Sequence, residues 1–175
     1  MSDGLPEGWL PTPFGVDEAE APALAAALTR IAADTLPGFI DGDDARTAMA
    51  ATIARAPITP GTIGRVWHVL GPDATGAIVD LSVVESAGSV PDSPFAHTVP
   101  QRAVVFLEGR AALSLVAPRE HVPVAMLLRA QRQDGGRTLV ADAIDAAPVL
   151  GLILDDVIAL VGGTPPGSEG LPSGD

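Results

Sequence analysis

The sequence contains no cysteine, lysine, tyrosine or asparagine. Without cysteine the chain can form no disulfide, offer no thiolate nucleophile and bind no metal through sulfur. Without lysine it has neither the phosphate-binding lysine of a P-loop nor an amine that could form a Schiff base with a substrate. Several classes of enzyme chemistry are therefore excluded by residue type alone.

Short catalytic and metal-binding motifs are also missing. The sequence has no GxSxG and no GxGxxG before a helix. Its three histidines, His68, His97 and His121, share no metal-ligand spacing. Asp41–Asp44 begins like a calcium loop but lacks the later ligands, so we interpret it as a helix cap. We expect no catalytic residue, no metal site and no cofactor.

Positive charge is scarce. The chain has 22 acidic and 10 basic residues and a net charge of −12. This balance argues against a nucleic-acid partner, because phosphate binding needs a concentrated basic surface. The longest apolar stretch, Val149–Val161, is interrupted by two aspartates and is too short to span a bilayer, so we expect no integral membrane segment. The first residues lack the features of a signal peptide, and we expect a cytoplasmic location, with export by a route that needs no cleaved signal left open.

Hydrophobic residues, by contrast, make up 47 % of the chain, enough for a packed core. Proline and glycine concentrate at both ends. We therefore expect a mobile segment at 1–16, one α+β domain at 17–162 and a disordered tail at 163–175.

Within that domain the hydrophobic period changes twice, from helical to strand-like and back to helical. Residues Glu18–Leu36 and Asp44–Ala54 have helical spacing. Pro148–Val161 is predicted to be an amphipathic helix that begins at a proline, with an apolar stripe of Leu150, Leu154, Val157, Ile158 and Val161. Between them lie short runs rich in Val, Leu and Ile, separated by turn sequences such as Asp134-Gly135-Gly136. We predict an α+β fold in which two helices precede an antiparallel meander of five to six strands and a helix closes the chain. The predicted strands are Ile63–Leu70, Ala77–Val84, Ala103–Leu107, Ala112–Ala117, Val124–Arg132 and Thr138–Ala141.

Two of these strands do not alternate between apolar and polar residues. Ala103–Leu107 and Val124–Leu128 are apolar on both faces, whereas an antiparallel sheet with one solvated face should alternate. Either helices cover both faces of the sheet, or one face is an interface.

Four residues are candidates for partner binding. Trp9 and Phe14 lie in the proline-rich N-terminal segment, where they either dock on the domain or form an extended recognition segment. Phe95 and His97 lie in Ser86–Pro100, which we predict to be the one long loop.

The C-terminal fifty residues resemble a known protein type. Two strands joined by a tight turn, AMLLRAQRQDGGRTLVADA, precede the helix DAAPVLGLILDDVIALVGG. This pattern is similar to the C-terminal part of small actinobacterial proteins of the Mog1/PsbP-like type, in which an amphipathic helix closes over an antiparallel sheet. The chain departs from that type where Ala147-Pro148 stands in place of a polar residue and proline. The resemblance implies binding and assembly roles and no catalytic residues.

Three hypotheses for function follow. The first is a non-enzymatic accessory, adaptor or chaperone-like factor that binds another protein, with a homodimer as one form of that binding. The second is a small hydrolase or isomerase whose site is built around His97 and the loop Ser86–Pro100. The third is an acidic immunity protein that neutralises a basic toxin.

Overall fold

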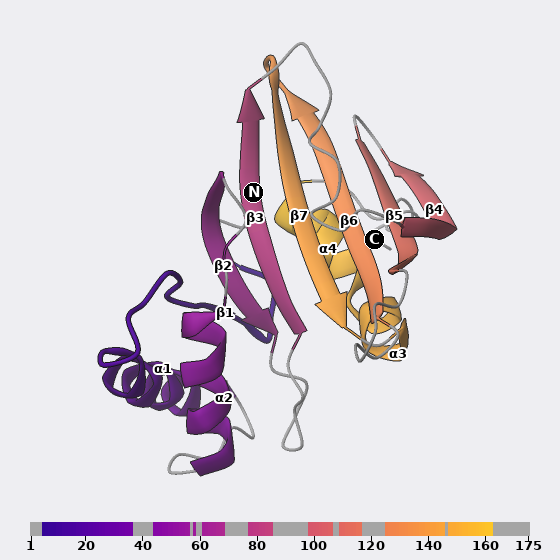
Figure 1. Ribbon diagram of the computed structural model, residues 1–175. Coiled ribbons are helices and arrows are strands. Elements are labelled where there is room, and N and C mark those ends of the chain that lie inside the picture. The colour runs from indigo at the N-terminus through magenta and orange to yellow at the C-terminus, as the bar shows by residue number, and fades with distance from the viewer. Residues whose placement is uncertain are drawn as a thin grey trace, which may run out of the picture. The chain divides into compact units, whose positions relative to one another are not determined.

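The computed structural model describes residues 5–36, 44–56, 58, 61–68, 77–85, 98–106, 109–116, 125–145 and 147–162 (Figure 1). The segment 86–97, which holds Phe95 and His97, and the position of His121 lie outside these residues. Helices and strands follow one another as β1 Trp9–Pro11, α1 Ala21–Thr35, α2 Asp44–Arg55, β2 Thr62–His68, β3 Ala77–Glu85, β4 Thr98–Phe106, β5 Gly109–Val116, β6 Ala125–Asp134, β7 Arg137–Asp145, α3 Ala147–Leu152 and α4 Leu154–Leu160.

The predicted α+β fold is confirmed, with more strands than expected. The described residues form one seven-stranded sheet in the order β1-β2-β3-β7-β6-β5-β4. The antiparallel meander that we predicted is present as two runs, β1–β3 and β4–β7, and the second run enters the sheet with β7 beside β3, so the order in the sheet is not the order in the chain. Twelve residues separate the end of β3 from the start of β4 in the sequence, whereas two strands joined by a tight hairpin turn are neighbours in a sheet.

The strand β1 lies in the N-terminal segment, for which we predicted no regular structure. Trp9, Leu10 and Pro11 pair antiparallel with His68, Trp67 and Val66 of β2. Three residues are too few to show a strand periodicity in the sequence.

The chain divides into two compact units, which are described separately. The N-terminal unit is Met1–Leu81 and the C-terminal unit is Ser82–Asp175, so the division falls inside β3. The prediction of one domain at 17–162 stays a prediction.

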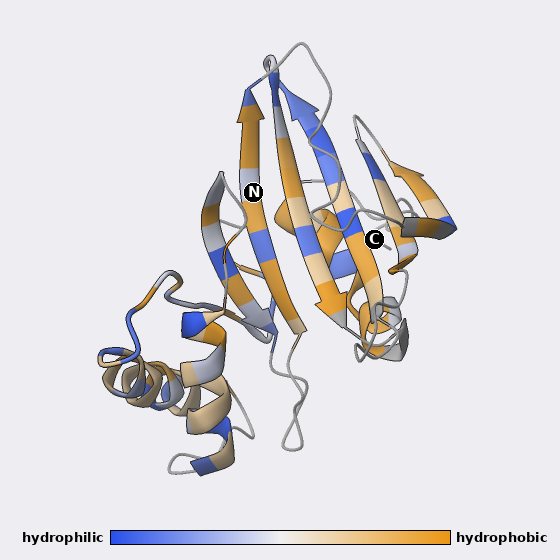
Figure 2. Cartoon of the chain, in the orientation of Figure 1, coloured by the Kyte–Doolittle hydropathy of each residue, from blue (hydrophilic) through white to orange (hydrophobic). Residues whose placement is uncertain are grey.

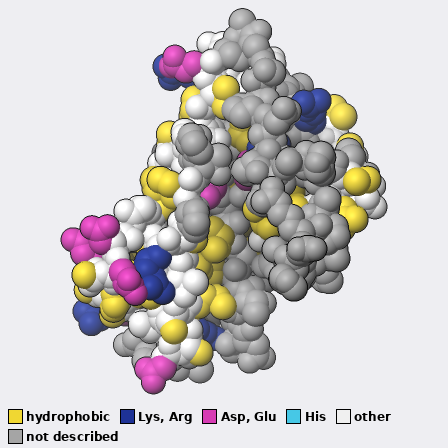
Figure 3. Space-filling view, in the orientation of Figure 1, with side chains coloured by type: hydrophobic (Ala, Val, Ile, Leu, Met, Phe, Trp, Pro, Cys, Tyr) yellow, Lys and Arg dark blue, Asp and Glu magenta, His cyan; other side chains and the backbone are white. Residues whose placement is uncertain are grey.

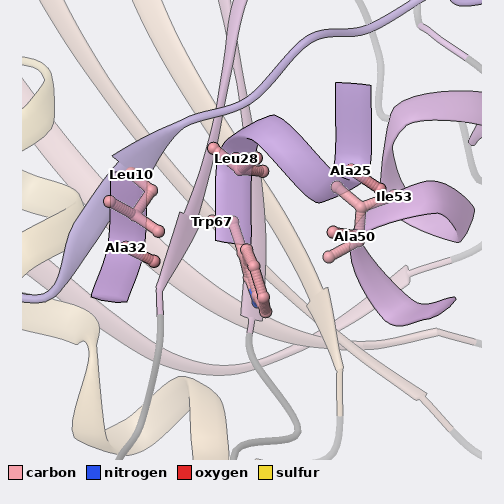
Figure 4. Packing of buried hydrophobic residues seen from close by; sticks show 7 residues of the cluster. All are labelled: Leu10, Ala25, Leu28, Ala32, Ala50, Ile53 and Trp67. Atoms are coloured by element: carbon pink, nitrogen blue, oxygen red, sulfur yellow. The ribbon is translucent and has the colours of Figure 1, made fainter. Parts of the chain in front are cut away.

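In the N-terminal unit, α1 and α2 pack on one face of the β1–β2 ribbon (Figure 4). Trp67 of β2 is fully buried at the centre of this core, beside Leu10 of β1 and Ile53 of α2. Alanines supply most of the helical side of the contact, and their small side chains let the helices approach closely: Ala25, Ala32 and Ala50. The helix α1 begins at Ala21, after a turn closed by the carbonyl of Asp17, and not at the predicted Glu18.

In the C-terminal unit, α3 and α4 lie on one face of β6 and β7 (Figure 1). The tight turn between these strands has positive φ at both Gly135 and Gly136, which only glycine adopts readily, so the predicted hairpin at Asp134-Gly135-Gly136 is confirmed. The single C-terminal helix that we predicted is broken at Ile153, whose φ of −100° and ψ of 6° are not helical.

The break in this helix accompanies an error in the predicted apolar stripe. We placed Leu154 on the buried side, but Ile153 is fully buried and Leu154 is only half-buried. The remaining stripe residues are buried as predicted: Leu150, Val157, Ile158 and Val161.

Candidate functional site

The predicted partner-binding residues that the structure describes are both in the N-terminal segment. Trp9 is 4 % exposed, and its ring lies 4.7 Å, centre to centre, from the ring of His68. Phe14 is half-buried. Trp9 therefore docks on the domain, which was one of the two alternatives for this segment, because pairing with β2 places its side chain in the packed interior.

Arg65 organises the N-terminal unit. It stands in the middle of β2, and its side chain is 2 % exposed. Its guanidinium donates two hydrogen bonds to the Asp80 carboxylate on β3, from Nε to Oδ1 at 2.6 Å and from Nη2 to Oδ2 at 2.8 Å. Its third nitrogen, Nη1, donates to the carbonyl oxygens of Ile53 and Ala56 at the end of α2, at 2.8 and 3.0 Å. The Ile53 carbonyl also accepts from the N–H of Ala56 at 3.2 Å. Both carbonyls lie at the C-terminal end of α2, so Arg65 joins the sheet to the negative end of that helix.

In the C-terminal unit, two arginines make the same two kinds of contact, an ion pair between strands and a hydrogen bond to a carbonyl at the end of a helix. Arg129 of β6 makes a two-pronged ion pair with Asp142 of β7, with both N–O distances at 2.7 Å. Arg132 donates from Nη1 to the carbonyl oxygen of Gly162, just after α4, at 3.0 Å. The hydropathy view shows the polar positions as bands across otherwise apolar strands (Figure 2). These contacts hold strands and helices together.

The C-terminal unit contains a small cavity between the sheet and α3–α4. Its volume is about 20 Å³, and its walls are mainly apolar, with Val104, Leu113, Leu128 and Leu150 among them. A space of this size holds about one water molecule, whereas ligand pockets usually measure several hundred Å³. The cavity cannot contain a substrate. Among the described residues, no group of three or more His, Asp or Glu side chains is placed to hold a metal ion.

The outer strand β4 is the most exposed apolar element of this unit. It ends the sheet, and within the described chain no other strand pairs with its outer edge. Val105 is 80 % exposed and Val99 is 54 % exposed, and Ala103 is exposed as well. Ala103 and Val105 lie on one face of the strand and Val99 on the other, as their β5 partners show. Hydrophobic side chains are visible at the surface over β4 in the space-filling view (Figure 3).

The charge along this margin differs from that of the chain as a whole. The described residues of β4 and β5 include two arginines, Arg102 and Arg110, and no aspartate or glutamate. Arg102 is exposed and forms no hydrogen bond or ion pair with another described side chain. We define the β4 margin as the outer edge of β4 with its flanking side chains. Its described residues include exposed apolar side chains and no acidic residue, in a chain of net charge −12.

The two strands that are apolar on both faces have different environments. In β6, Met126, Leu127 and Leu128 are all at most 8 % exposed, so both faces of that strand are covered. In β4, by contrast, the face that carries Val105 is exposed to solvent. Apolar composition on both faces identified the two strands, but only the order of the sheet shows which of them is at the edge. Thr98–Pro100, which we predicted to be part of the long loop, belongs to β4.

None of the helices in the described part of the chain combines the length and apolar character that a membrane span requires. Compared with models of protein families, with curated proteins and with solved structures, the chain matches none of them, and its resemblance to Mog1/PsbP-like proteins stays a prediction.

Proposed function

We propose that the chain is a non-enzymatic protein-binding factor of the accessory, adaptor or chaperone-like kind, that it acts in the cytoplasm, and that it docks its partner on the β4 margin. The observation that carries this proposal is the 80 % exposure of Val105 on an outer strand. An edge strand offers a row of backbone donors and acceptors to another protein, and exposed apolar side chains beside them favour burial. A partner strand that paired with β4 would cover side chains on both faces of β4.

The rest of the described molecule supports binding over catalysis. The cavity beside α3 and α4 is too small for a substrate. In the ion pairs Arg65–Asp80 and Arg129–Asp142, the charge of each arginine is matched by the carboxylate of its aspartate. Each pair also links two strands of the sheet. The β4 margin is thus the described surface that best combines exposed apolar area with open backbone groups.

The test is site-specific photocrosslinking in cells that produce the protein naturally. A photoreactive amino acid replaces Val105 in one variant and Leu152 in a second. Leu152 is a matched control, because it is 75 % exposed and apolar, lies in the same unit and belongs to α3 instead of β4. We expect a defined crosslinked protein from position 105 and none from position 152. Identical products from both positions, or none from position 105, would contradict docking at β4.

A further inference from the structure

We infer that the occupant of the β4 margin is β4 of a second copy of the chain, paired antiparallel about a two-fold axis that passes through Val104. This inference rests on the proposed function and names its partner. It is carried by the register of β4, by the side chains that the axis brings together and by the charge of the margin.

The regular part of β4 determines where the axis lies. The pairing of β4 with β5 is interrupted between Pro100 and Arg102, and it is regular from Arg102 to Phe106. Pro100 has no N–H to donate, so it does not extend a ladder on the outer edge. The far end of the stretch is Phe106, whose ring packs so close to Gly109 of β5 that a Cβ there would overlap it. An antiparallel pairing that uses all five residues of this stretch is centred on Val104.

This register also matches the side chains. Residues directly opposite each other in an antiparallel pair lie on the same face. On the exposed face, Ala103 of each copy lies opposite Val105 of the other, so a small residue meets a larger one twice. On the other face, Val104 lies opposite its own counterpart. The side chain with the highest exposure in β4, Val105, is thereby covered.

Charge favours contact at this margin over other described surfaces. Each copy carries a net charge of −12, so two copies repel each other unless their acidic residues stay apart. The described residues of β4 and β5 carry no acid. In the register centred on Val104, each Arg102 lies opposite Phe106, four residues from the other Arg102, which is about 13 Å along the strand. That separation exceeds the Debye length of about 8 Å at physiological ionic strength, so the two arginines interact weakly.

The expected dimer is weak and reversible. Five paired residues on each side bury less area than the roughly 1,600 Å² of a standard stable interface. The remaining repulsion comes from acidic residues outside the contact, which salt screens. We therefore expect the dimer to become tighter as ionic strength rises, whereas a dimer held by ion pairs would weaken.

The absence of cysteine allows a direct test of the register, because one engineered cysteine is the only thiol in the chain. Opposed residues in an antiparallel pair have Cα atoms about 4.5 to 5.5 Å apart, within the range that a disulfide spans. Under mild oxidation we expect Val104→Cys to form a disulfide-linked dimer at least about tenfold faster than Leu152→Cys, the exposed control on α3. Equal rates for the two variants would overturn the proposed axis.

A second measurement does not depend on an engineered thiol. Light scattering coupled to size exclusion should show the unmodified chain shifting towards the mass of a dimer as salt is raised. Val105→Asp should abolish this shift, and Leu152→Asp should preserve it. A monomer at every salt concentration would overturn self-pairing, and docking at β4 would still stand if photocrosslinking from position 105 captured a different protein. If position 105 captured no protein at all, both proposals would fall.

Discussion

Arg65 is a charged side chain in the interior of the N-terminal unit, where it donates hydrogen bonds to Asp80, Ile53 and Ala56. Replacing it with alanine leaves the Asp80 carboxylate and two carbonyls at the end of α2 without these donors. Removing one partner of a buried ion pair typically costs about 3–5 kcal/mol, and the 20 % exposure of Asp80 favours the lower end of that range. We expect Arg65→Ala to lower the free energy of unfolding by about 3 kcal/mol, measured by urea denaturation.

The matched control is Arg137→Ala. Arg137 pairs with Glu85 at 3.2 Å, but their side chains are 64 % and 79 % exposed. Exposed pairs contribute little because water screens them, and the loss should be at most about 1 kcal/mol. Similar losses for the two variants would show that Arg65 does not hold the unit together.

The two buried ion pairs share a signal that is visible in the sequence and that our sequence analysis did not use. Arg65 stands in the strand TIGRVWH and Asp80 in the next strand, AIVDLSVVE. Arg129 and Asp142 also stand in consecutive strands, but β6 and β7 each carry further charges, so the signal is clearest for Arg65 and Asp80. A lone charge in an apolar strand is costly to bury, so a lone opposite charge in the following strand indicates a cross-strand pair. Contacts of Arg65 with the end of α2 could not be predicted in this way, because they depend on tertiary structure.

At the scale of elements, the C-terminal helix provides a sharp contrast between neighbouring residues. Ile153 is fully buried where α3 ends and α4 begins, and Leu154 is half-buried beside the small cavity. Ile153→Ala should therefore lower the free energy of unfolding by about 2–5 kcal/mol, and Leu154→Ala by less. Urea denaturation of both variants tests this order. If Leu154→Ala were the more destabilising variant, the uninterrupted helix predicted from the sequence would describe the protein better.

The strands show which features local sequence can predict. Runs of Val, Leu and Ile located six strands, because a buried strand must be apolar whatever its neighbours are. The strand β1 was missed because three residues, WLP, carry no period, and Thr98–Pro100 was taken as loop because proline is rare inside sheets. The order of the strands was not predictable, because the position of β4 at the edge is decided by pairing between distant segments. The surface that we propose for docking was therefore recognised as apolar but could not be located.

At the scale of the whole molecule, β3 links the two compact units. It runs without interruption from Ala77 to Glu85, and the boundary between the units falls between Leu81 and Ser82. Both tryptophans of the chain, Trp9 and Trp67, lie in the N-terminal unit. Tryptophan fluorescence therefore reports on that unit, whereas far-UV circular dichroism reports on the helices and strands of both.

This arrangement of probes allows a test of whether the chain unfolds as one domain. If one unit unfolded alone, β3 would have to break in the middle, and the strand residues left behind would lose part of their ladder. We therefore expect one cooperative transition, with coincident midpoints by fluorescence and by circular dichroism. Ile153→Ala is in the C-terminal unit, far along the chain from either tryptophan, and it should lower both midpoints by the same denaturant concentration. A fluorescence midpoint that did not move in Ile153→Ala, while the circular dichroism curve split into two steps, would show that the units are independent domains.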